Sequence, residues 1–133
     1  MLQFRFAIIP ILLLLTQNVL RAQGFNEKIY QSYISGDMEQ WLEVLNEMET
    51  LRESISSHEL IYDIAIAQYG YIAFSISAGK NDQAKEYVNM LEENLELLEK
   101  FYSEPAIIHA LKGATQGYKV GINPYKAVFF GRK

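Results

Sequence analysis

The sequence contains no cysteine and only two histidines, His58 and His109. Without cysteine, the chain has no disulfide, no thiolate metal site, no thiol nucleophile and no acceptor for a lipid anchor. Neither histidine has further ligand residues at metal-binding spacing. Tyr62 also stands where the zinc-protease pattern beginning at His58 requires a second histidine. We therefore predict structural or surface roles for both histidines, with no metal and no cofactor.

A catalytic constellation is also lacking. The glycines of the segment GYIAFSISAG (70–79) have the wrong spacing for a phosphate-binding loop, and no strand precedes them. Four acids of one expected helix could be paired catalytic carboxylates, but they lie away from its apolar stripe, which favours a solvated face. These acids are Glu92, Glu93, Glu96 and Glu99. The sequence thus predicts a protein that is not an enzyme.

The N-terminal apolar run is too short to cross a bilayer comfortably, which takes about 20 residues. The run FAIIPILLLL follows Arg5 and leads into the polar segment TQNVLRAQ. This order is typical of a secretory signal peptide over residues 1–22, cleaved after Ala22, so that the mature protein begins at Gln23. The alternative is an uncleaved membrane anchor. Export without cysteine favours a periplasmic or cell-envelope location in a Gram-negative bacterium.

Acidic residues are absent after Glu104. Residues 23–104 hold five cations and all 16 acids, whereas residues 105–133 hold five cations and no acid. Nucleic-acid binding is not indicated, because it would need a broad basic face. An acidic body with a basic end favours head-to-tail self-association, or a fragment whose balancing residues lie elsewhere.

Strand patterns are almost absent, and apolar residues recur at spacings of three and four. This periodicity predicts five helices, over residues 26–35 and about 38–54, 57–78, 82–102 and 105–121. Gly113 and Gly117 lie one turn apart in the last helix, and we expect them to let it pack closely against a neighbour. The expected capping residues of the second to fifth helices are Asp37, Ser56 (in a box with Glu59), Asn81 or Asp82, and Ser103 or Glu104.

Three glycines that are expected to end helices recur with separations of 43 and 42 residues: Gly36, Gly79 and Gly121. Helices precede all three, and further helices follow the first two. Periods in this range are typical of helical solenoids. The spacing therefore predicts an internal repeat of a two-helix unit.

Within each unit the pattern resembles the tetratricopeptide repeat. Gly79 is followed at the family's small-residue position by Ala84, and then by Val88 and Leu91 at its next two core positions. The first unit has Trp41 where the family has alanine, and the third contributes only a first helix. The resemblance covers residues 26–121, but the period is longer than the family's and the proline that usually closes the second helix is absent. The whole chain resembles exported, poorly characterised tetratricopeptide-like proteins of Gram-negative bacteria.

The resemblance implies an all-α fold of about five helices, in which antiparallel helical hairpins stack as a short right-handed solenoid. The expected domain covers residues 23–121, with units at about 26–57 and 58–103 and an incomplete unit at 104–121. A basic aromatic tail follows over residues 122–133. The residues expected to be structural are Gly36, Trp41, Gly79, Ala84 and Gly121.

Two functions are compatible with these features. The first is a non-catalytic scaffold of the cell envelope that binds a protein or peptide in a solenoid groove, whole or as a fragment of a longer repeat protein. The second is an envelope accessory protein that binds a small carbohydrate or lipid through surface tyrosines. Tyr71 and Tyr87 lie on apolar stripes, so we expect them in the core. The expected partner-binding residues are Tyr33, Tyr69, Tyr118, Tyr125, Phe129 and Phe130.

Overall fold

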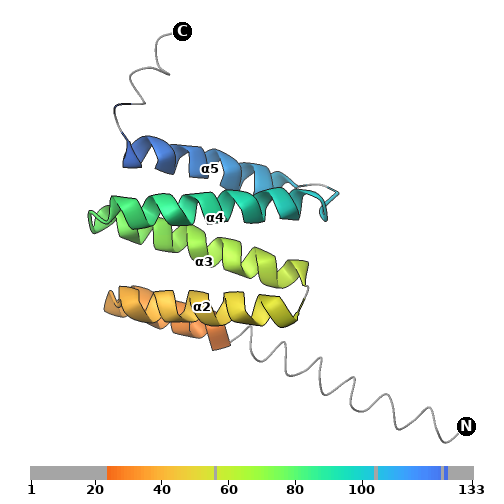
Figure 1. The fold of residues 1–133 in the computed structure, drawn as a ribbon, viewed down its shortest axis with the longest axis horizontal. Coiled ribbons are helices and arrows are strands. Elements are labelled where there is room, and N and C mark those ends of the chain that lie inside the picture. Colours follow the sequence, from red (N-terminus) through yellow and green to blue (C-terminus); the bar gives the residue numbers. More distant parts are fainter. Residues whose placement is uncertain (1–23, 56, 104, 124, 126–133) are drawn as a thin grey trace, which may run out of the picture. The chain divides into compact units, whose positions relative to one another are not determined.

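A computed structural model describes residues 24–55, 57–103, 105–123 and 125. Within these ranges the backbone forms five helical segments and no strand (Figure 1), so the predicted all-α class is confirmed. The expected signal peptide and two of the expected partner-binding residues, Phe129 and Phe130, lie outside the described residues. The helical segments are residues 24–35, α2 (Met38–Ser54), α3 (His58–Ser77), α4 (Asn81–Glu99) and α5 (Ala106–Ile122).

The chain divides into two compact units, and the division falls within α2, between Val44 and Leu45. In the first unit, Phe25 and the start of α2 contribute buried side chains. Trp41 is 5% exposed, so the burial expected from its place on the apolar stripe is confirmed. The ring of Tyr33 meets the Trp41 ring edge-on, with centroids 6.4 Å apart.

Gly36 and Gly79 end their helices in the same way. Both have a positive φ, 69° and 72°, which glycine adopts without steric cost. The next amide, that of Asp37 or Lys80, donates to the carbonyl five residues back, and the glycine amide donates to the carbonyl three residues back. This pair of hydrogen bonds defines the Schellman motif. The prediction that these two glycines end helices is confirmed.

Gly121 differs from the other two glycines. α5 continues past it to Ile122, and Gly121 is not among the glycines with positive φ. The expectation that the last helix ends at Gly121 is therefore wrong by one residue. The expectation that Gly113 and Gly117 pack closely against a neighbouring helix is also wrong. A Cβ atom added to either glycine would have no atom of a neighbouring element within 4 Å. Both glycines lie on an exposed face of α5.

The helix caps follow the sequence only in part. Asp37 caps α2 as predicted, since its Oδ1 accepts from the Gln40 amide at 2.9 Å. The cap of α3 is Ser57 rather than Ser56, and its hydroxyl accepts from the Leu60 amide at 3.3 Å. For α4 and α5 the polar residues expected as caps are not used. Lys80 and Pro105 occupy those positions, without a side-chain hydrogen bond.

In the second unit α3 packs against α4 and α5, and α4 packs against α5 (Figure 1). The α3 residues facing this interior include Ile64, Tyr71 and Ile72, all at most 1% exposed. α3 is also long and apolar enough to cross a membrane, with a mean hydropathy of 1.2. The core helix of a soluble protein has the same length and composition, and eight of the 20 residues of α3 are buried.

Candidate functional site

Two glutamates of α4 hold α5 in register. Glu99 pairs with Lys112 and lies 3.4 Å from His109 Nδ1. Glu92, seven residues earlier, pairs with Lys119 and accepts from Gln116 Nε2 at 3.0 Å. Each glutamate thus contacts two α5 residues three apart, and the second pair lies seven residues beyond the first. Because residue numbers rise along α5 as they fall along α4, the two helices run antiparallel.

These contacts change the interpretation of the α4 acids. Glu93 and Glu96 are exposed, as a solvated face requires, but Glu92 and Glu99 are only partly exposed and pair with α5. The hydrogen bond from Lys112, with the charges of Lys112 and His109, holds the pKa of Glu99 below its usual value. Lys112 and Lys119 therefore pair with acids of the same chain.

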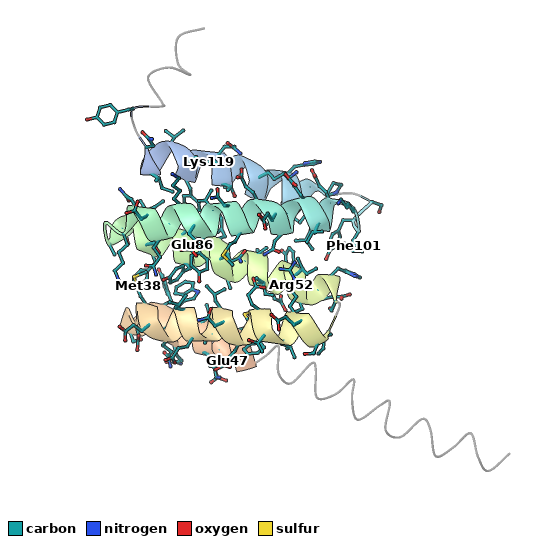
Figure 2. The ribbon with its side chains drawn as sticks, in the orientation of Figure 1. Met38, Glu47, Arg52, Glu86, Phe101 and Lys119 are labelled. Atoms are coloured by element: carbon teal, nitrogen blue, oxygen red, sulfur yellow. The ribbon has the colours of Figure 1, made fainter. Side chains whose placement is uncertain are left out.

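The pairs that Glu92 and Glu99 form with α5 make an ion-pair ladder between α4 and α5. Beside this ladder lies a groove of about 730 Å³, between the first half of α4 and the end of α5. Lys119, labelled in Figure 2, stands at its α5 side. The lining contains four side-chain amides, three charged residues and three aliphatic residues. They are Asn81, Asp82, Lys85, Val88, Asn89, Gln116, Lys119, Val120, Ile122 and Asn123.

Apolar and amide side chains line the groove together. Val88 is 1% exposed, whereas Val120 at 44% is open to solvent, and the four exposed amides form the rim of the groove. Amide side chains both donate and accept hydrogen bonds, so the rim can satisfy the N–H and C=O groups of a peptide backbone. Residues with these properties can bind a ligand but contain no nucleophile paired with a base.

A second polar feature lies inside the second unit, where four side chains from three helices form a closed ring of hydrogen bonds. Arg52 donates to Asn94 Oδ1 at 2.8 Å, and Asn94 donates to Gln68 Oε1 at 2.9 Å. Gln68 donates to Glu49 Oε1 at 3.3 Å, and Arg52 returns to Glu49 Oε2 at 3.4 Å. Arg52 marks the position of this ring in Figure 2. Every member has partners, so the ring is structural rather than an open ligand site.

The tyrosines expected to bind a partner have different surroundings. Tyr69 of α3 and Tyr118 of α5 lie against each other, with ring centroids 4.9 Å apart, and both are only partly exposed. Burial, followed by the hydrogen bond with Tyr69, raises the pKa of Tyr118. Tyr33 and Tyr125 are exposed, at 64% and 83%. Of these four residues, the structure shows Tyr69 and Tyr118 in contact with each other.

Tyr71 and Tyr87 are in the core, as expected from their places on apolar stripes. Their rings meet edge-on with centroids 4.7 Å apart, across α3 and α4. Burial, then the neighbouring Tyr71 and the acids Glu86 and Glu49, raises the pKa of Tyr87 to about 12. Neither hydroxyl is suited to bind a surface ligand.

None of the groove residues was among the predicted partner-binding positions. Asn81 and Asp82 were noted only as caps, and the amides Asn89 and Gln116 have no distinguishing pattern in the sequence. The groove arises because α4 and α5 pack side by side. That packing is a tertiary property, and the spacing of residues along either helix alone does not predict it.

The two histidines have surface roles in the structure. His58 stacks on Phe101, with ring centroids 5.5 Å apart, and lies 3.0 Å from Glu59. Nowhere in the described ranges do three or more His, Asp or Glu side chains gather as a metal site. No family model, curated protein or solved structure matches the chain.

Proposed function

We propose that this protein is a non-catalytic scaffold that binds a peptide segment in the groove between α4 and α5. The observation that carries the proposal is the groove itself, which exposed side-chain amides and aliphatic side chains line together. An extended peptide exposes backbone donors and acceptors on its edges and alternates the direction of its side chains. The amides complement the edges, and Val120 offers an apolar contact for one side chain.

The proposal includes a tetratricopeptide-like solenoid as the fold. The two Schellman turns, 43 residues apart, support it because they repeat the same hydrogen bonds. Buried residues also repeat at this separation, since each α2 position of the family pattern has a buried counterpart in α4. The pairs are Trp41 with Ala84, Leu45 with Val88, and Met48 with Leu91.

Export to the cell envelope belongs to the same proposal and depends on the apolar segment before Ala22. In that location, a peptide-binding scaffold would act on extended segments of other envelope proteins. The charge distribution also favours self-association, and the exposed Ile107 and Val120 of α5 would be apolar contacts for a second copy of the chain.

Display of a random peptide library on phage, selected against the purified mature chain, tests the proposal. Selected peptides should lose binding to Asn89→Trp, because the indole would occupy the groove. Glu96→Trp is the matched control, since Glu96 is an exposed α4 residue outside the groove. If selected peptides bind both variants equally, the groove is not the peptide site. If none is selected, the chain is not a general peptide scaffold.

A further inference from the structure

The charges of the groove indicate which peptides it accepts. Two of its three charged residues are lysines, although the chain as a whole carries a net charge of −4. Lys119 is paired with Glu92. Lys85 is exposed, and no carboxylate of the described residues forms an ion pair with it. Lys85 is therefore the cation of the groove that is available to a ligand.

The first turn of α4 adds partial positive charge at the same end of the groove. Asn81 and Asp82 of that turn line the groove, and the N-cap residue Lys80 supplies no side-chain hydrogen bond to it. Backbone N–H groups at an uncapped helix start favour a nearby negative charge. Asp82 supplies one such charge from within the turn, and Lys85 stands one turn further along the helix.

From Lys85, the first turn of α4 and the adjacent Val120, we infer that the groove selects acidic peptides. A ligand carboxylate would lie between Lys85 and the start of α4, with a neighbouring apolar side chain on Val120. This inference rests on the proposed peptide-binding function and names its ligand class. Over residues 23–104 the chain holds 16 acids against five cations, so the rest of that segment repels an acidic peptide.

The test uses three rhodamine-labelled octapeptides in which leucine alternates with glutamate, glutamine or lysine. Their binding to the mature chain is followed by fluorescence anisotropy at low and high salt. We expect the glutamate peptide to bind several-fold more tightly than the glutamine peptide. Lys85→Gln should weaken the glutamate peptide about threefold and reduce its salt dependence, as loss of one exposed charge contact does. Lys100→Gln, at an exposed lysine beyond the far end of α4, should leave binding unchanged.

The outcomes separate the inference from the function on which it rests. Equal binding of the glutamate and glutamine peptides, abolished by Asn89→Trp, would overturn the acidic preference and leave the groove as a peptide site. Tightest binding of the lysine peptide would overturn it too. An absence of binding by all three peptides, or binding indifferent to Asn89→Trp, would count against the peptide-binding groove itself.

Discussion

The side-chain amide of Asn94 on α4 donates to Oε1 of Gln68 on α3 across 2.9 Å, and the two residues are 2% and 0% exposed. Through Arg52 and Glu49 the same ring reaches the end of α2. An amide pair in an apolar interior is stable only while each polar atom has a partner. The pair therefore fixes how α3 and α4 align, because sliding either helix would leave buried amides unpaired.

Replacing one member of this pair should destabilise the protein more than replacing both. Asn94→Leu leaves the Gln68 oxygen and one Arg52 donor without their partner, and should lower the free energy of unfolding by about 2–3 kcal/mol. The double variant Asn94→Leu with Gln68→Leu should recover part of that loss. Urea denaturation of the parent chain, the single variant and the double variant measures these free energies of unfolding. Asn89→Leu, at an exposed asparagine of the same helix, should change stability by less than ~0.5 kcal/mol, and a similar result for Asn94→Leu would contradict the ring.

Trp41 tests the first unit. Because its side chain is 5% exposed, Trp41→Ala should lower the free energy of unfolding by about 3–5 kcal/mol, from lost apolar burial and the cavity left behind. Thermal or urea unfolding followed by circular dichroism would report it. A loss below ~1 kcal/mol would mean that Trp41 is not packed in solution.

Alkaline pH should weaken the second unit through Tyr87. Its pKa is raised to about 12 in the folded chain, from 10.0, so the folded state holds this proton more tightly than the unfolded state. The associated stability is complete below pH ~10 and is lost as pH rises towards 12, by about 2–3 kcal/mol. Equilibrium unfolding in urea at pH values from 8 to 12 would show the decline.

Two variants separate Tyr87 from other alkaline effects. Tyr87→Phe keeps the ring contact with Tyr71 but has no proton to lose, so its stability should fall less steeply above pH 10. Tyr30→Phe, at a residue 60% exposed, is the matched control and should follow the parent chain. Identical pH profiles for the parent and Tyr87→Phe would rule out this origin.

Acid should loosen α5 from α4. The pKa of Glu99 is lowered mainly by the hydrogen bond from Lys112, so its contribution is present at neutral pH and is lost as pH falls through that lowered value. Protection factors of α5 amides in hydrogen exchange should therefore drop between pH 6 and pH 3. They should already be lower at pH 6 in Glu99→Gln. Glu96→Gln, an exposed acid on the same helix, should leave them unchanged, and equal effects of both variants would argue against the ion-pair ladder.

The N-terminal prediction concerns residues outside the described ranges. The short apolar run after Arg5 and the small residue Ala22 predict cleavage on export, so the exported protein should begin at or near Gln23. Intact-mass spectrometry of protein recovered from a Gram-negative periplasm would show it. Retention of residues 1–22 would instead favour the membrane anchor.

Local chemistry explains what the sequence predicted well. The all-helical class follows from apolar spacings of three and four, and the turns at Gly36 and Gly79 follow from the low cost of positive φ in glycine. The burial of Trp41 was predicted correctly because the apolar residues of its helix lie on a single face, and Trp41 is one of them. Caps were predicted less well. Ser56 and Ser57 offer the same hydroxyl one residue apart, whereas the N-cap residues of α4 and α5 are Lys80 and Pro105, whose side chains make no capping hydrogen bond.

By itself, the sequence of this protein determined that it is helical, where two of its turns lie and which stripes are buried, because each depends on residues a few positions apart. Only the tertiary structure decided that Glu92 and Glu99 pair with α5, that Tyr69 meets Tyr118, and that amides from α4 and α5 line one groove. These contacts join residues 13 to 49 positions apart. Their formation depends on how the helices align, which the ring of Gln68, Asn94, Arg52 and Glu49 constrains through the cost of burying an unpaired polar group.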